Sequence, residues 1–171
     1  MVLANIRFLP YIPLLLACGI TALSPPAMAS LQGQRFQDWG GNCEAGAYNR
    51  NICYLEQVLS HNDQPLMITV IGYAPGKPMP TIFFELPKDI AIQNGITLQV
   101  DNQAPIRFQG QCNETRCTAG FALDQKILAQ FRKGRRATVS YQGQADSRQV
   151  QLPLSLMGIS AGLNALQRSA S

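Results

Sequence analysis

The sequence predicts an all-β fold, an antiparallel β-sandwich with two short helices, on three observations. Short runs rich in β-branched and aromatic residues recur between turn signals. Several runs alternate apolar and polar residues, as at 96–100 and 137–141. Two later segments instead repeat apolar residues at helical spacing. Alternation indicates strands with one buried and one wet face, which suits antiparallel sheets packed face to face.

Nine runs are expected to form strands: residues 35–39, 53–59, 66–73, 81–86, 96–100, 106–109, 119–123, 137–141 and 149–154. The run at 66–71 is more continuously apolar than the others, which predicts a central strand. Residues 74–80 should end that strand, because proline supplies no ladder donor and glycine tolerates turn angles. Asn94 and Gly95 mark a further turn.

The first predicted helix covers residues 125–132. Asp124 is suited to cap its start and Gly134 to end it. Three apolar side chains share one face at helical spacing: Ile127, Leu128 and Phe131.

The second predicted helix covers residues 156–166. One apolar stripe runs along it, formed by Leu156, Ile159, Leu163 and Leu166. We expect this stripe to dock on the sandwich. Membrane-surface binding is disfavoured, because only Arg168 follows the stripe and the opposite face is small rather than cationic.

Residues 1–29 read as a signal peptide for export. Arg7 precedes an apolar stretch, and Ala27 and Ala29 supply the small residues that a signal peptidase requires before Ser30. Pro10 and Pro13 interrupt the apolar run, which disfavours a membrane span of about 20 apolar residues. Residues 30–171 are then expected to form a single domain, located in the periplasm or secreted to the outer surface.

Cys18 leaves an alternative open. Leu15, Leu16, Ala17 and Cys18 are similar to a bacterial lipobox, in which the cysteine is lipidated and anchors the protein to a membrane. Leu16 is unusual for its position in such a motif. We therefore favour cleavage after Ala29 over lipidation at Cys18.

The remaining cysteines form two close pairs. In an oxidising compartment two disulfides are the default, and closeness in sequence favours Cys43 with Cys53 and Cys112 with Cys117 among three connectivities. Each short bridge would contribute roughly 2–3 kcal/mol by the chain-entropy model. Neither pair has zinc-knuckle or C-x-x-C spacing, and His61 is the only histidine. We therefore expect no metal and no cofactor.

The charge is modest. Removal of Arg7 with the signal peptide lowers the formal net charge from +4 to +3. A local basic cluster is a candidate site for an anionic surface, lipid or lipopolysaccharide, and consists of Arg132, Lys133, Arg135 and Arg136. The simpler interpretation is a solvated helix end, where cations favour the negative pole of the helix dipole. Export and modest charge disfavour nucleic acid as a partner.

An enzyme is the second hypothesis, with a hydrolase or redox site that the sequence does not reveal. Asp38 and Asp101 are candidates for a general acid and base, and His61 for activating Ser60. No pattern brings these residues together. Residues 61–64 look like a turn, which predicts an exposed histidine, and Asp38 with Trp39 is expected to set the first strand and a core anchor.

An ordered series of short motifs runs from residue 35 to residue 166. It opens with residues 36–39 and Cys43, followed by 53–57, and continues through 86–90, 95–101 and 108–119 to the ending at 152–158. This series resembles the invasion-associated locus B family of exported bacterial proteins. The chain departs from it slightly around Gly158, where Met157 and Ile159 stand instead of a basic residue and an aromatic.

The resemblance implies an immunoglobulin-like β-sandwich, in the periplasm or at the outer surface of a Gram-negative, alphaproteobacterial cell. It implies no defined reaction, and invasion is a family label rather than an activity of this chain. The first hypothesis is therefore a binding or structural protein of the cell envelope, with an envelope or surface protein or an anionic lipid as its partner.

Overall fold

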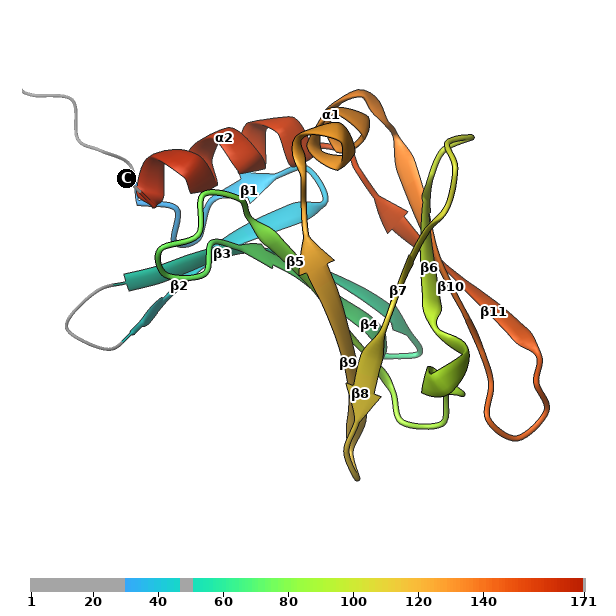
Figure 1. The fold of residues 1–171 in the computed structure, drawn as a ribbon. Helices are drawn as coiled ribbons and strands as arrows, with labels where there is room; N and C mark the ends of the chain where they lie inside the picture. The colour runs from blue at the N-terminus through green and yellow to red at the C-terminus, as the bar shows by residue number, and fades with distance from the viewer. Residues whose placement is uncertain (1–29, 47–50, 171) are drawn as a thin grey trace, which may run out of the picture.

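The computed structural model describes residues 30–46 and 51–170, which form two antiparallel sheets and two α-helices (Figure 1). The signal peptide and Cys18 lie outside the described residues. The larger sheet has the strand order β1 (Arg35–Phe36), β2 (Trp39–Ala45), β3 (Asn51–His61), β4 (Gln64–Gly72), β5 (Thr81–Pro87), β9 (Arg116–Ala122) and β8 (Gly110–Cys112). The smaller sheet has the order β11 (Gln149–Ser155), β10 (Arg136–Gln142), β6 (Ile96–Val100) and β7 (Ile106–Phe108). The predicted immunoglobulin-like antiparallel sandwich is confirmed.

Alternation along the strands builds the core. On β5, Ile82, Phe84 and Leu86 are buried while Phe83 between them is 51% exposed. Burial alternates in the same way on β6 and β10 of the smaller sheet, so apolar side chains of both sheets meet in one cluster. The run at 66–71 lies in β4, the middle strand of the larger sheet, as its continuous apolar character predicted.

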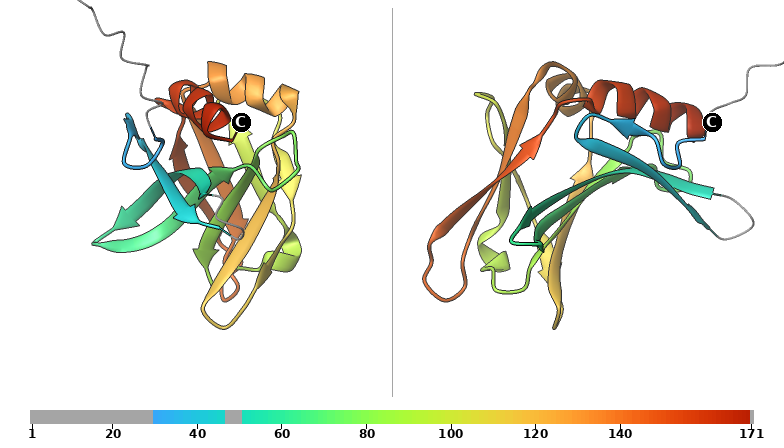
Figure 2. Two further views of the ribbon diagram at one scale, coloured as in Figure 1. Left: turned by 90° about the vertical axis from the view of Figure 1, so that its left-hand side faces the viewer. Right: turned by 180° about the vertical axis from the view of Figure 1, so that it is seen from behind.

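Both predicted helices are present. Helix α1 (Gln125–Lys133) begins where the Asp124 carboxylate accepts a hydrogen bond from the Ile127 N–H at 2.8 Å, and it ends at Gly134. A glycine is required at position 134 because the Cβ of any other residue would lie 2.7 Å from the Val100 side chain, which is too close for two carbon atoms. Its torsion angles do not require glycine. In Figures 1 and 2, helix α2 (Ile159–Ser169) lies across the β1–β2 end of the larger sheet, and it contacts β1, β2, β3 and α1.

The two long sides of the sandwich are closed differently. On one side the chain passes directly from β7 in the smaller sheet to β8 in the larger sheet through Gln109, so the backbone itself joins the sheets. On the other side β11 is an edge strand, and side chains of β2 and β3 hold its end.

Three sequence predictions needed correction. The run at 35–39 is a hairpin rather than a strand, because Gln37 turns the backbone with φ 56° between β1 and β2. The run at 106–109 ends at Phe108, where the chain changes sheets, and the strand that follows, β8, was not predicted. The second helix begins at Ile159 instead of residue 156, because Gly158 adopts φ 86° and comes too close to the Phe36 carbonyl for any Cβ.

Within the described residues, neither helix combines the length and the apolar character that a membrane crossing requires. The apolar stripe of α2 is instead used for packing, since Ile159, Leu163 and Leu166 are each at most 2% exposed. Its predicted docking on the sandwich is confirmed.

Thr69 offers a test of the core. Its side chain is fully buried on the inner face of β4, between Gln57 and Phe84 in the strand register, and its hydroxyl has no hydrogen-bond partner among the described residues. A buried hydroxyl without a partner costs free energy, and valine has the same shape without it. We predict that Thr69→Val raises the free energy of unfolding by about 1 kcal/mol in urea denaturation. Thr97→Val, at a partly exposed position of β6, should change it by less than about 0.5 kcal/mol, and a loss of stability in Thr69→Val would contradict the prediction.

Candidate functional site

A groove of about 840 Å³ lies where β3 of the larger sheet meets β10 and β11 of the smaller one. It is lined by Gln57, Leu59, Asp101, Asn102, Arg135, Arg136, Thr138, Pro153, Ser155 and Met157. These residues come from four distant parts of the chain. The groove combines two arginines, the carboxylate of Asp101, several neutral polar groups and an apolar part formed by Leu59, Pro153 and Met157.

Ser155 lines the groove, and its backbone is held by two side chains of the larger sheet. The Gln57 amide accepts a hydrogen bond from the Ser155 N–H at 2.9 Å and donates one to its carbonyl at 3.1 Å. The Trp39 indole N–H donates to the same carbonyl at 3.0 Å. Trp39 is fully buried, so the predicted core anchor with a partner for its N–H is present. We call Trp39, Gln57 and Ser155 the Ser155 junction.

Asp38 completes this end of the structure. The Ser155 hydroxyl donates to the Asp38 carboxylate at 2.5 Å and accepts from the Met157 N–H at 3.2 Å. Asp38 therefore fixes the turn before Gly158. Its role in the structure is the positioning of chain segments.

Asp101, another lining residue of the groove, has a comparable role. Its backbone has φ 43°, and its carboxylate accepts hydrogen bonds from the N–H groups of Arg135 and Arg136, both at 3.1 Å. The carboxylate thus holds the backbone that carries the two arginines. Asp38 and Asp101 each serve a different segment, and no hydrogen bond joins the two candidates for an acid–base pair.

The basic cluster divides into three places. Arg132 donates to the Asn164 side chain at 2.8 Å and to the Ser160 carbonyl at 3.4 Å, which ties α1 to α2. Lys133 borders a separate depression of about 390 Å³ beside Gln130. Of the four basic residues, only Arg135 and Arg136 line the groove. The structure thus separates the four residues that the sequence places together.

Asp101 bonds only the backbone of the two groove arginines, and among the described residues their guanidinium groups form no ion pair with a carboxylate. In the described part of the chain the ion pairs are Arg116 with Glu85 and Arg148 with Asp146, and neither includes a groove residue. Because a guanidinium offers five donors in a planar fork, two such side chains in one concave surface are suited to carboxylate, phosphate or sulfate groups.

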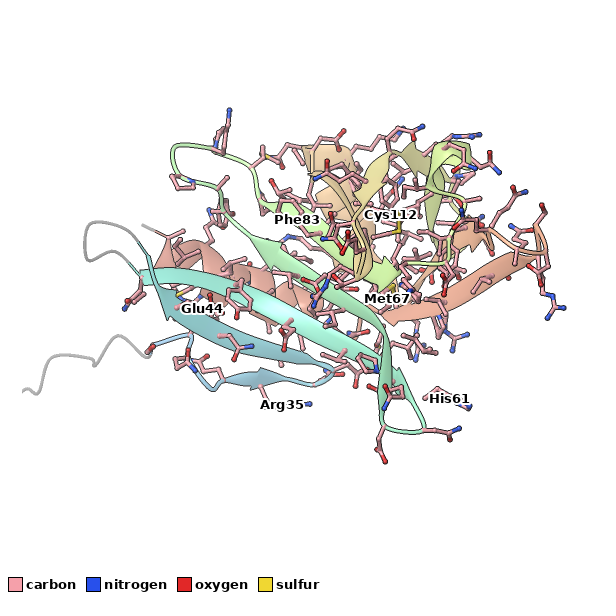
Figure 3. All side chains as sticks on the ribbon, turned by 90° about the horizontal axis from the view of Figure 1, so that it is seen from below. Arg35, Glu44, His61, Met67, Phe83 and Cys112 are labelled. Atoms are coloured by element: carbon pink, nitrogen blue, oxygen red, sulfur yellow. A yellow bond between two sulfur atoms is a disulfide. The ribbon has the colours of Figure 1, made fainter. Side chains whose placement is uncertain are left out.

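The other candidates lie elsewhere. His61 sits at the exposed tip of the β3–β4 hairpin (Figure 3), where Asn62 and Asp63 form the turn with positive φ, so the predicted turn is confirmed. No hydrogen bond links His61 to Ser60 or to any other hydroxyl of the described residues. Over residues 30–46 and 51–170, no group of three histidine, cysteine or acidic side chains is arranged to hold a metal ion.

The four cysteines of residues 30–171 lie in two cross-strand pairs. Cys43 on β2 is bonded to Cys53 directly opposite on β3, with Cα atoms 4.0 Å apart. Cys112 on β8 is bonded to Cys117 on β9 at 3.9 Å. These pairs lock strands near the two edges of the larger sheet and lie outside the groove lining.

Residues 39–167 match the family model described as Invasion associated locus B (IalB) protein. The chain belongs to the IalB family. Two Brucella abortus proteins, each named an Invasion protein B homolog and found in strain 2308 and in biovar 1 strain 9-941, are 24% identical to it over 149 residues, which is 85% of this chain and 85% of each relative. The resemblance seen in the sequence is confirmed.

A solved structure shares the fold of this IalB-family chain. The crystal structure of invasion associated protein b from Bartonella henselae aligns with a TM-score of 0.71 and 18% identity, and the alignment covers 79% of this chain and 94% of that one. At this identity the likeness shows the fold alone.

Sequence reasoning missed the central residues of this IalB groove. Gln57 and Ser155 are 98 positions apart, and neither belongs to a motif with a known chemical role. One signal was present, because Gln57 occupies an inward-facing position of β3 between Leu55 and Leu59. A polar side chain in an inward apolar series requires a buried partner.

The Ser155 junction predicts a stability effect. Gln57→Leu leaves the Ser155 N–H without its partner and removes one of two donors to the carbonyl, so it should lower the free energy of unfolding by about 1–3 kcal/mol. Urea denaturation measures this change. Gln111→Leu, at an exposed position of β8, is the matched control and should change stability by less than about 0.5 kcal/mol. Equal effects of the two substitutions would contradict the role of the junction.

Tyr54 predicts a pH effect outside the groove. Its hydroxyl donates to Glu44 at 2.6 Å, and this bond, then burial and the charges of Glu44 and Glu56, raise the pKa of Tyr54 to about 12. The folded protein therefore keeps this proton to higher pH than the unfolded chain. The stabilising contribution should be complete below pH 10 and should disappear as pH rises through about 12.

Ultraviolet titration of tyrosinate checks this, with Tyr54→Phe identifying the signal of Tyr54. Glu44→Gln removes the charge and should move the pKa of Tyr54 back toward 10. An unchanged titration in Glu44→Gln would show that Glu44 is not the cause.

Proposed function

We propose that this IalB-family protein is an exported binding protein of the cell envelope that holds a partner through anionic groups placed in the groove. The observation that carries the proposal is the pair Arg135 and Arg136. Both line one concave surface, both are positioned through Asp101, and neither forms an ion pair with a described residue. Charged groups left unpaired in a groove are suited to a ligand of opposite charge.

Export is supported by two independent features of the chain. The first 29 residues have the order of a signal peptide, with cleavage after Ala29 favoured and lipidation at Cys18 as the alternative. The two disulfides are typical of proteins of an oxidising compartment such as the periplasm or the outside of the cell, which supports export. An envelope or surface protein, an anionic lipid or lipopolysaccharide is therefore the kind of partner available.

The hydrolase or redox alternative has weaker support. Asp38 and Asp101 accept hydrogen bonds that position the chain, His61 lies at an exposed hairpin tip, and the cysteines are paired in cross-strand disulfides. A binding role explains the unpaired arginines, whereas an acid–base mechanism leaves them without a use.

Charge reversal in the groove tests the proposal. The full chain is expressed with export, and the protein is purified. Three probes are then titrated separately at two salt concentrations: phosphatidylglycerol vesicles, lipopolysaccharide and an acidic peptide. Arg135→Glu with Arg136→Glu should weaken binding of the recognised anion by about tenfold or more, because two favourable contacts become repulsive.

The matched control is Lys77→Glu with Lys88→Glu, which makes the same change in net charge at exposed positions outside the groove. Chemical crosslinking and mass spectrometry on intact cells then compare the partners of the two double variants. Recovery of the same partners in equal amounts from the wild type and the groove variant would show that the arginines are only a solvated face.

A further inference from the structure

The edge strand β11 has backbone groups that point away from its single neighbour. Among the described residues β11 pairs with β10 and with no other strand. The Leu156 N–H donates to the Arg135 carbonyl at 3.0 Å, and the Gly143 N–H donates to the Arg148 carbonyl at 2.9 Å. Both bonds continue the β10–β11 register. They identify the pairs in which backbone groups face each other.

Antiparallel strands alternate between such bonded pairs and pairs whose backbone groups point outward. The even-numbered residues of β11 therefore bond to β10, and the odd-numbered residues face the free edge: Gln149, Gln151, Pro153 and Ser155. The Ser155 junction agrees with this assignment, since both backbone groups of Ser155 are bonded by Gln57 from outside the sheet. The Gln57 amide takes the position of a peptide group in a neighbouring strand.

Among the described residues no strand pairs with the rest of this edge. Gln149, Gln151 and Pro153 are exposed, and beyond Ser155 the edge offers the N–H and C=O groups of the two glutamines and the C=O of Pro153. A proline on an edge commonly prevents strand pairing. Here Pro153 removes a single N–H donor, next to Ser155, whose backbone groups are already bonded by Gln57. Pro153 and Gln57 together therefore define where an added strand would end.

The positive charge beside the Ser155 end of β11 favours an acidic segment as the added strand. Pro153 and Ser155 line the groove together with Arg135 and Arg136. An extended segment along β11 would reach the two arginines at its groove end. Its inward side chains would cover Leu59, which is only half-buried at this open side of the sandwich. Acidic residues on the outer face and apolar residues on the inner face match these surroundings.

We propose that β11 accepts an extended acidic segment of a partner protein as an added strand, with its carboxylates on Arg135 and Arg136. The proposal rests on the proposed function for its charged part and on the β11 edge for its backbone part. Main-chain hydrogen bonds to the two glutamines and to the Pro153 carbonyl provide affinity, and the arginines provide selectivity.

A labelled peptide of about eight residues that alternates glutamate and valine is the probe, measured by fluorescence anisotropy on the exported, purified full-chain product. Gln151→Pro removes one edge-facing N–H, and Pro153 shows that β11 accepts proline in the same orientation. This variant should weaken peptide binding by tenfold or more. Gln151→Thr keeps the N–H and should bind within about twofold of the wild type.

A second set of peptides tests the backbone without changing the protein. The same sequence N-methylated at alternate residues loses the strand-pairing donors and should not bind, and a lysine–valine peptide should bind at least tenfold more weakly. Thermal unfolding of each protein variant verifies its fold. Equal binding of the methylated and unmodified peptides, or equal binding by Gln151→Pro and the wild type, would overturn the proposal.

The outcomes separate this proposal from the broader one. Binding of anionic vesicles or lipopolysaccharide that depends on Arg135 and Arg136, without peptide binding, would sustain the groove and overturn the added strand. Peptide binding that depends on Gln151 but not on the arginines would overturn the role of the charges. Dimerisation in analytical ultracentrifugation that Gln151→Pro abolishes would show that a second copy, and not an acidic partner, covers the edge.

Discussion

The Ser155 carbonyl, bonded by both Trp39 and Gln57, is the contact on which the arrangement of the two sheets depends. It joins the end of β11 to the first two long strands of the larger sheet. The indole is fully buried, so its N–H needs this acceptor, and the glutamine amide lies on the inward side of β3, where the core would otherwise require an apolar side chain. Loss of Gln57 leaves the Ser155 N–H without a hydrogen bond, which is destabilising for a buried group, whereas loss of Trp39 leaves the carbonyl with Gln57 as its one donor.

The same contact explains why a groove exists on this side of the sandwich. At the opposite side, the backbone continues from β7 of the smaller sheet into β8 of the larger sheet and so joins the two sheets directly. At the end of β11 the connection to β2 and β3 is made by side chains, which bond the backbone of Ser155. The sheets are joined at Ser155, and the groove beside this junction is lined by Arg136 and Thr138 of β10 and by Gln57 and Leu59 of β3.

Much of the fold follows from local patterns, because alternation and turn residues report on single strands. The Asp124 cap, the apolar stripe of α2 and the central position of β4 are all consequences of nearby residues. Two of the errors occur where the conformation of a single residue, and not the composition of its segment, decides the backbone. Gln37 turns although its segment has strand composition, and Gly158 must be a glycine because the Phe36 carbonyl, over a hundred positions earlier, occupies the space of a Cβ. The predicted basic surface is divided for another reason. Residues that are neighbours in sequence at a helix end lie in different surroundings, so they do not form a single surface.

The disulfides protect the larger sheet and leave an edge of the smaller sheet available. In the larger sheet, Cys43–Cys53 joins the strands beside one edge and Cys112–Cys117 joins the last two strands at the other. Each bond is cross-strand, so it fixes the pairing of an edge that would otherwise fray or exchange partners. In the smaller sheet, β7 is short and continues into β8, which leaves β11 as the longest edge strand without covalent protection among the described residues. Its protection consists of Pro153 and the Gln57 amide, and both act at the Ser155 end. An edge strand that is shielded only against aggregation would be blocked along its length, whereas β11 is blocked at one end and accessible at the other. It provides a defined stop for an added strand, and the two arginines without an ion-pair partner among the described residues stand at that stop.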